Sequence, residues 1–185
     1  RGTTREGGGY TEEDAETRKG EHASEGVARD RSVDFYSRQG GGSEVALLRI
    51  NYETDLRYGV PVDLARKIWN GEPIALTNGF FNCIWQGDAN EMILRAFRLA
   101  ASPARAWNLT SPGVYQVREV AAELGAFLGR EPVLSGRESE SALLSNSAAR
   151  CATLGAPPTG RGTILERTAH GVQIGGLELG QPTHC

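Results

Sequence analysis

Val45-Ala-Leu-Leu-Arg-Ile-Asn51 is the stretch on which the fold assignment depends. It is a short apolar run bounded by glycines and polar residues, and such a run predicts a buried strand. A helix is predicted over 62–69, because Pro61 suits a first helical turn and Gly71 suits a helix end. A second strand is predicted over 106–110. Strand and helix alternate through this region, which predicts the α/β class.

The strongest helical signal runs from Asp88 to Ala101, where apolar residues recur at i, i+3, i+4 and i+7. Asp88 is expected to cap this helix, with Glu91 reaching back to the first turn. The residues assigned to its apolar face are Ala89, Met92, Ile93, Ala96, Phe97 and Ala100. The other predicted elements are a surface helix over 23–38, a helix over 116–128 ended by Gly129, a strand over 132–135, and helices over 146–154 and 163–172.

Composition divides the 185-residue chain into segments of different character. Residues 1–43 are expected to form a charged, glycine-rich arm that carries the surface helix. This arm has very few large apolar side chains, so it buries too little surface to offset its ordering entropy. Residues 44–154 form the α/β body. Residues 155–185 form a glycine- and proline-rich tail with one short helix.

Charge and composition argue against several classes of protein. The formal net charge of -3 disfavours a nucleic-acid binder, which normally has a basic stripe. The chain has no apolar run near the roughly 18 residues that cross a membrane and no signal-peptide core at its start. Scattered cysteines favour reduced thiols and a cytoplasmic location. Scattered histidines without metal-ligand spacing predict no metal site. The residues concerned are Cys83, Cys151, Cys185, His22, His170 and His184.

Aromatic and amide side chains crowd together between Thr77 and Asp88. One interpretation is a hydrophobic strand packed under the following helix, which accounts for Phe80 and Phe81. The other is a sugar pocket, in which amides such as Asn82 supply oriented hydrogen bonds beside flat apolar faces. The residues alone leave both interpretations open.

Several landmarks in one order resemble a known family. They are Val45–Asn51, Tyr58-Gly59, Ile84-Trp-Gln-Gly-Asp88, Trp107-Asn-Leu-Thr110 and Val117-Arg-Glu-Val120. In this order and spacing they resemble the C-terminal half of NAD-dependent epimerase/dehydratases, the extended short-chain dehydrogenase/reductases. The resemblance covers 44–154, with weaker similarity over 11–38 and 176–184. It implies an incomplete Rossmann-like parallel sheet with the C-terminal substrate-binding subdomain.

The resemblance also implies parts that we do not find in the chain. The family's glycine-rich phosphate loop and active-site Ser or Thr are expected at or before Arg1, and no G-x-G-x-x-G occurs. The family's Tyr-x-x-x-Lys pair should open the helix before Val45, but His22 stands at the Tyr position and Gly26 at the Lys position. A neutral imidazole could act as a general base near pH 7, so His22 is the candidate catalytic residue. We expect the isolated chain to be inactive in hydride transfer.

The resemblance places the remaining candidate residues. Asn51 and Tyr52 would lie near the nicotinamide of NAD or NADP, because ligands gather outside the carboxyl ends of parallel strands. The candidates for the substrate side are Arg57, Asn82, Trp85 and Gln86. Arg57 suits a phosphate or carboxylate.

The predicted function is that of an NAD(P)-dependent epimerase/dehydratase-like protein for a sugar or nucleotide-sugar-like substrate. The alternatives are a non-catalytic substrate-binding or scaffold module and a partially unfolded fragment. The sequence leaves open the substrate, the choice between NAD and NADP, and whether the chain forms a homodimer.

Overall fold

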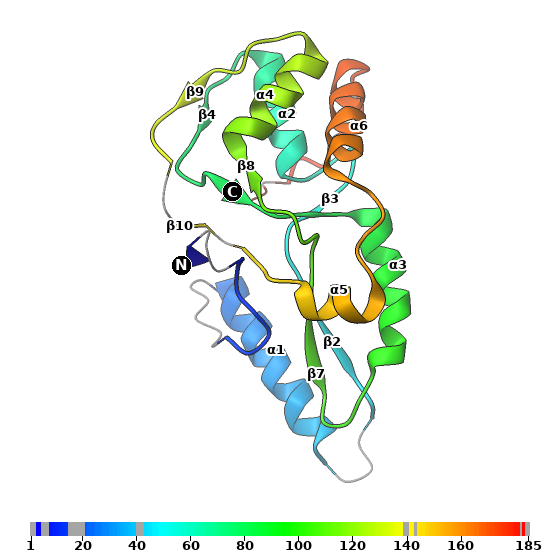
Figure 1. Ribbon diagram of the computed structural model, residues 1–185. Coiled ribbons are helices and arrows are strands. Elements are labelled where there is room, and N and C mark those ends of the chain that lie inside the picture. Colours follow the sequence, from blue (N-terminus) through cyan, green and yellow to red (C-terminus); the bar gives the residue numbers. More distant parts are fainter. Residues whose placement is uncertain are drawn as a thin grey trace.

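The computed structural model describes residues 3–4, 8–14, 21–39, 43–138, 141–142, 144–181 and 183. Helices and strands alternate along these residues (Figure 1), which confirms the α/β class. A 3-10 turn at Phe97–Leu99 directly follows α3. The helices in chain order are α1 (Glu21–Ser37), α2 (Val60–Asn70), α3 (Gln86–Ala96), α4 (Val117–Leu128), α5 (Ala148–Leu154) and α6 (Arg161–Gln173).

The strands are short and pair in twos. The parallel pairs are β2 with β7, β3 with β6 and β4 with β9, whereas β1 with β10 and β5 with β8 are antiparallel. Their bounds are β1 (Thr3–Thr4), β2 (Ala46–Ile50), β3 (Glu53–Thr54), β4 (Ile74–Ala75), β5 (Phe80–Phe81), β6 (Ile84–Trp85), β7 (Arg105–Leu109), β8 (Tyr115–Gln116), β9 (Leu134–Ser135) and β10 (Ser141–Ala142).

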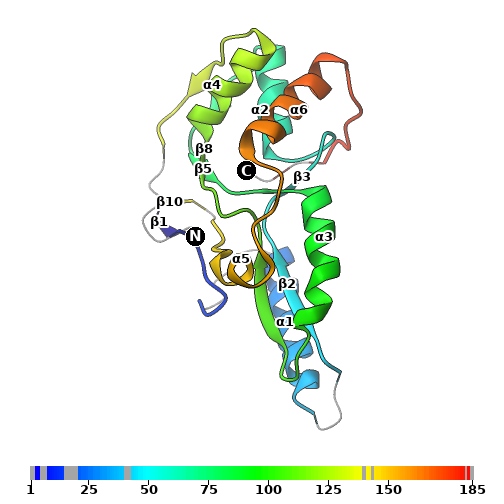
Figure 2. The same cartoon turned by 45° about the vertical axis from the view of Figure 1, so that its right-hand side comes forward.

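The pair β2–β7 runs in register from Ala46 beside Arg105 to Ile50 beside Leu109. Successive side chains of a strand point to opposite faces. Leu48 and Leu109 therefore share one face, and there they join an apolar cluster with Ala89 and Met92 of α3. Arg49 points to the other face, toward α1. The ribbon shows β2 and β7 side by side between α1 and α3 (Figures 1 and 2).

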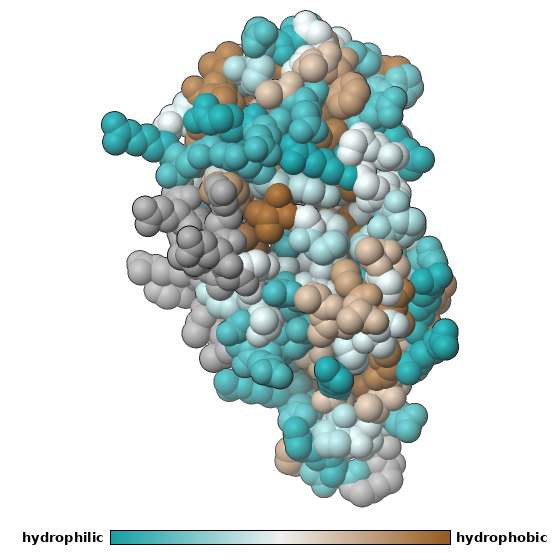
Figure 3. Space-filling view, viewed as in Figure 1, coloured by the Kyte–Doolittle hydropathy of each residue, from teal (hydrophilic) through white to brown (hydrophobic). Residues whose placement is uncertain are grey.

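A second part of the molecule is built from α2, α4 and α6, which pack together beyond the β2–β7 pair (Figure 1). Their apolar faces enclose the larger core cluster, which includes Leu64, Ile68, Val120, Leu124 and Leu165. Figure 3 shows hydrophilic side chains over much of the surface, with apolar ones gathered over α5 and where the two parts meet.

Glycine ends two of these helices as predicted. Gly71 follows α2 at φ 71°, and Gly129 follows α4 at φ 65°. Both adopt the left-handed conformation that glycine reaches without a steric penalty. The amide of Gly129 donates to a carbonyl of the last turn, and that of Gly71 does the same for α2.

The prediction for α3 was wrong at both ends. The helix begins after Trp85, so Asp88 is in its first turn and caps nothing. The Asp88 carboxylate instead accepts bonds from the Thr159 amide (2.9 Å) and hydroxyl (2.8 Å). Glu91 pairs with Arg95 at 2.8 Å. Because the helix tightens into a 3-10 turn after Ala96, Phe97 leaves the apolar face and is 76% exposed.

Candidate functional site

The carboxyl ends of β2 and β7 form the centre of the candidate site. Asn51 directly follows β2, and its amide donates to Leu109 O of β7 at 3.1 Å. Tyr52 then adopts φ 43°, an uncommon conformation for a bulky residue. This turn directs the chain into β3, and the Tyr52 carbonyl accepts the Ile84 amide of β6 at 3.1 Å. The strained residue therefore joins the β2–β7 edge to the stretch that holds Asn82.

Asn82 bridges distant parts of the chain at this edge. Its Oδ1 accepts the Asn51 Nδ2–H at 2.7 Å and the Ser145 amide at 3.3 Å. Its Nδ2 donates to Ser145 O at 2.7 Å. Asn82 is 1% exposed, so both ends of its amide are satisfied inside the protein. The structure thus brings the predicted residues Asn51 and Asn82 into direct contact.

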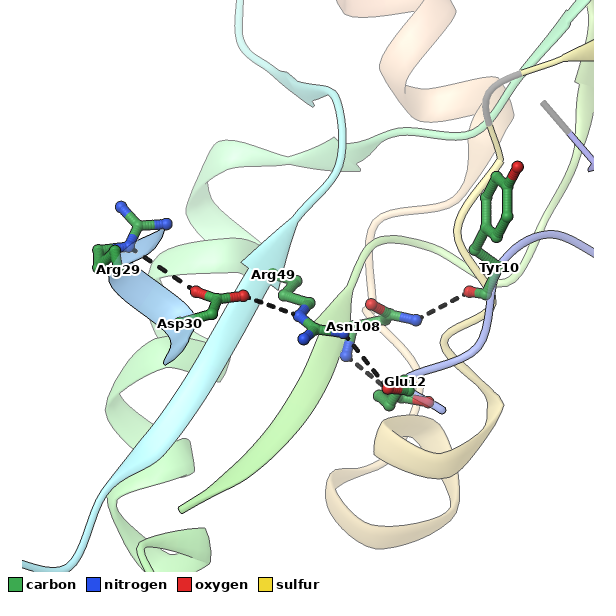
Figure 4. Close-up of polar contacts among 6 residues, drawn as sticks. All are labelled: Tyr10, Glu12, Arg29, Asp30, Arg49 and Asn108. Carbon is green, nitrogen blue, oxygen red and sulfur yellow. Dashed lines mark hydrogen bonds and ion pairs between the residues drawn. The ribbon is translucent and has the colours of Figure 1, made fainter. Parts of the chain in front are cut away.

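A second polar network covers the opposite side of the same strands (Figure 4). The Asn108 amide donates to Glu12 Oε1 at 2.8 Å, and Asn108 Nδ2 donates to Tyr10 O at 2.9 Å. Arg49 Nε donates to Asp30 of α1 at 3.0 Å, and Arg49 Nη1 donates to Glu12 O at 3.3 Å. Residues 8–14 therefore lie along β7 and are hydrogen-bonded to the β2–β7 pair on the face opposite α3.

Arg150 of α5 is fully buried beneath the end of β7. Its guanidinium donates to Thr110 O at 2.6 Å and to Gly155 O at 2.8 Å. Burial lowers the pKa of Arg150, because the charged form is poorly solvated there. Sequence reasoning did not identify Arg150, Glu12 or Asn108 as members of the site. The sequence signal for this network was the occurrence of two polar residues, Arg49 and Asn108, inside otherwise apolar strand segments.

The other substrate candidates make different contacts. Arg57 is exposed, and its Nε (2.9 Å) and Nη2 (2.6 Å) donate to Asp55 Oδ2. Trp85 lies in β6 beside Thr54, and the Arg167 guanidinium is 5.8 Å from the centre of its ring. Gln86 is the first residue of α3. The network of Asn51 and Asn82 does not include any of these residues.

A hollow of about 200 Å³ opens beside the β5–β8 pair. It is lined by Phe80, Val114, Gln116 and Glu119. Gln116 Nε2 lies 3.1 Å from both carboxylate oxygens of Glu138. None of the residues that line the hollow belongs to the network of Asn51, Asn82 and Ser145. Sequence reasoning had singled out the Phe80 stretch but neither Gln116 nor Glu119.

The described residues do not fit a dinucleotide. Among them no strand leads through a glycine-rich turn into a helix, the arrangement that receives a pyrophosphate. The Asn51 side chain is bonded to Asn82, and Tyr52 packs against the larger core cluster. His22 lies in the first turn of α1, and its side chain is outside the described part of the structure.

The described residues contain no group of His, Cys, Asp or Glu side chains arranged to hold a metal ion. No helix in the part of the chain that the structure describes is long and apolar enough to cross a membrane.

Neither a protein-family model nor a curated protein matches the chain. Solved structures do match. UDP-glucose 4-epimerase of Thermus thermophilus, in complex with NAD, aligns with a TM-score of 0.66 and 16% identity over 87% of this chain and 60% of its own. UDP-glucuronic acid 4-epimerase of Bacillus cereus, also with NAD, aligns with a TM-score of 0.73 and 10% identity, over 89% and 54%.

A short-chain dehydrogenase/reductase superfamily protein of Agrobacterium tumefaciens with bound NAD aligns at a TM-score of 0.70 and 14% identity, over 89% of this chain and 61% of its own. The chain thus spans little more than half the length of these structures. The matched region is the C-terminal part of the solved chains. The chain therefore has an NAD-dependent epimerase/dehydratase-like fold, with the partial Rossmann-like sheet that the sequence predicted.

Proposed function

We propose that the chain forms the substrate-binding part of an NAD(P)-dependent epimerase/dehydratase-like protein that acts on a sugar or nucleotide-sugar-like substrate. The observation that carries this proposal is the contact of Asn51 with Asn82 at the carboxyl ends of β2 and β7. Ligands of open α/β folds bind at such strand ends. The fold match to epimerases named for UDP-glucose and UDP-glucuronic acid supports the substrate class.

Within this proposal each candidate residue has a distinct task. Asn51 and Tyr52 form the carboxyl end of β2, where the cofactor would bind. Asn82 holds this strand end in place through its hydrogen bonds to Asn51 and Ser145. Trp85 offers a flat apolar face, and Gln86 offers an amide beside it. Arg57 is the cation for a phosphate, and a bound phosphate would compete with Asp55 for it. His22 remains our candidate for the proton-transferring residue.

A non-catalytic binding module is the second candidate function. It is favoured by one observation, the occurrence of His22 and Gly26 where the family pattern has Tyr and Lys. A module of this kind would retain the substrate side of the site and would exchange no proton with the substrate. Both candidates require that the chain bind a sugar nucleotide.

Thermal unfolding with separate additions of UDP-glucose, NAD and NADP tests the proposal. UDP-glucose at roughly 100 times its Kd is expected to raise the Tm by about 5 °C, since a ligand that binds only the folded state stabilises it. Trp85→Ala should weaken this effect, whereas Trp69→Ala, at the far end of α2, should leave it intact. A Tm that UDP-glucose does not change would contradict the proposal. Hydride transfer to added NAD would separate an enzyme from a binding module.

A further inference from the structure

The segment that follows α6 turns back toward the loop after β3 (Figure 2). We call residues 174–181 the strap. Two of its backbone groups reach other elements: the Leu179 amide donates to Arg57 O at 3.2 Å, and the Gly176 carbonyl accepts from Arg66 Nη2 of α2 at 3.1 Å. The strap thus connects α2 with the loop that carries Arg57.

The apolar side chains of the strap contribute little to its attachment. Ile174 is 68% exposed, Leu177 is 83% exposed and Leu179 is 51% exposed. A segment that buries little apolar surface lacks the main favourable contribution to folding. The strap is therefore held chiefly by polar contacts, whose net contribution is small because water competes for the same groups.

Arg66 provides two of these polar contacts. Besides the bond to Gly176 O, its Nη1 lies 3.1 Å from Glu178 Oε2, and both side chains are partly exposed to solvent. One turn earlier in α2, the Asp63 carboxylate accepts the hydroxyl of Thr183. An ion pair that solvent reaches is weakened by salt. The attachment of the strap to α2 is therefore sensitive to ionic strength.

A glycine lies where the strap leaves α6. Gly175 has φ 67°, a left-handed conformation that glycine adopts without a steric penalty, and nothing lies within 4 Å of the position of a Cβ. Hinges consist of a few residues at the ends of elements that absorb large changes in φ and ψ. Gly175 thus permits the strap to move away while α6 keeps its packing on α2 and α4.

We propose that the strap is a detachable segment, held on α2 by Arg66 and hinged at Gly175, whose closure fixes the loop of residues 55–58. In the closed state the Leu179 amide holds the Arg57 carbonyl, and opening removes this contact. Segments with few buried apolar contacts open locally, at a lower free energy than global unfolding. Such opening does not depend on whether the chain binds a sugar nucleotide.

Amide hydrogen exchange followed by NMR tests this proposal on the full chain without a ligand. The Leu179 amide reports on the strap. The Asp55 amide, which donates to Tyr58 O at 2.9 Å, reports on the loop, and the Leu124 amide in the core of α4 reports on global unfolding. Arg66→Met retains an apolar stem and removes both contacts with the strap. We expect about tenfold faster exchange at Leu179 and Asp55 and an unchanged rate at Leu124.

Arg95→Met is the matched control. It removes another solvent-exposed ion pair, that of Arg95 with Glu91 at 2.8 Å on α3, and should change none of the three exchange rates. Salt gives a second comparison. Raising NaCl from about 0.1 M to about 1 M should accelerate exchange at Leu179 in the unaltered chain and have little effect in Arg66→Met, because salt screens the pair of Arg66 with Glu178.

Three results would overturn the proposal. The first is an unchanged rate at Leu179 in Arg66→Met, which would mean that Arg66 does not hold the strap. The second is an equal acceleration at Leu124, because the strap would then open only with the whole molecule. The third is faster exchange at Leu179 with an unchanged rate at Asp55, which would show that the strap detaches without supporting the loop of Arg57.

Discussion

Two ionisable side chains near the candidate site are removed from water to different extents: Glu53 is partly buried and Arg150 is fully buried. Burial raises the pKa of Glu53, and the nearby negative charge of Asp55 raises it further. Burial lowers the pKa of Arg150, whose charge is satisfied by backbone carbonyls. In both residues the surroundings disfavour the charged form, so both should affect stability.

Replacing Glu53 by Gln should stabilise the protein at neutral pH and have little effect in acid. Because the pKa of Glu53 is raised by folding, the folded state holds the proton more tightly than the unfolded state does. The associated stability is present below the unfolded pKa and is lost as pH rises through the folded pKa. Urea unfolding should show a gain of roughly 0.5 kcal/mol for Glu53→Gln at pH 7. The exposed Glu131→Gln serves as control, and an equal gain at pH 3.5 and pH 7 would contradict this explanation.

Replacing Arg150 by Ala should destabilise the fold by about 3 kcal/mol or more. The change opens a cavity and leaves the Thr110 and Gly155 carbonyls without their donor. Chemical unfolding measures the free energy of unfolding of Arg150→Ala and of a control, Arg98→Ala, on the exposed 3-10 turn. The control should change this free energy by no more than about 0.5 kcal/mol. Similar losses for the two variants would show that Arg150 is not a buried link between α5 and β7.

At this scale the sequence identified single residues but not their partners. Asn51 and Asn82 were named separately, one from its place after a strand and the other from its aromatic neighbours. Their mutual bond depends on the turn at Tyr52, which no local pattern encodes. Glu12 and Arg150 were missed for a related reason. An acidic segment and a short helix with one arginine have the composition of solvated surface, and only tertiary packing makes these side chains structural.

Glycines of positive φ flank α2 on both sides, and they differ in conformation and in surroundings. Gly59 precedes the helix at φ 121°, and Gly71 follows it at φ 71°. A Cβ on Gly59 would lie 2.6 Å from the Cβ of Thr54 in β3, whereas nothing lies within 4 Å of a Cβ on Gly71. Gly59 thus allows α2 to start directly against β3.

Alanine substitutions at these two glycines should differ in cost, because only Gly59 combines backbone strain with steric overlap. Gly71→Ala should cost about 1 kcal/mol of unfolding free energy, which is the penalty for a left-handed alanine. Gly59→Ala should cost about 3 kcal/mol, because alanine rarely adopts its φ of 121° and the new Cβ would also overlap Thr54. Urea midpoints measure both. Equal losses would mean that β3 moves aside to admit the methyl group.

Elements with strong periodicity were predictable, and the pairings between short strands were not. In α4 the apolar residues at helical spacing are all buried: Val117, Val120, Ala121, Leu124 and Leu128. Two-residue strands such as β5 carry too few side chains for a pattern, and their partner is fixed by the chain that surrounds them. The end of α3 was predicted wrongly because α-helices often finish in a 3-10 turn, and apolar spacing does not show where that turn begins.

Across the whole molecule, segments far apart in the chain are fastened to the core. Residues 8–14 reach β7 through Glu12 and Tyr10 (Figure 4). The segment after α6 returns to α2, where Arg66 donates to Gly176 O at 3.1 Å and Thr183 donates to Asp63. The N-terminal segment is thus attached to β7, and the segment after α6 is attached to α2.

Glu12→Ala should loosen this arrangement without unfolding the protein. The Asn108 amide would lose its acceptor at the edge of β7, so its hydrogen exchange should accelerate about tenfold. Amide exchange followed by NMR gives the measurement, with the exposed Glu13→Ala as control. Unchanged protection at Asn108 would indicate that residues 8–14 do not secure β7.

The double bridge made by Asn82 carries a chemical consequence of its own. Aspartate is nearly the same size and shape as asparagine, yet it would set an anionic oxygen against the Ser145 carbonyl where an N–H now donates. Deamidation of Asn82 would therefore replace the hydrogen bond to Ser145 O with a repulsion between two oxygen atoms.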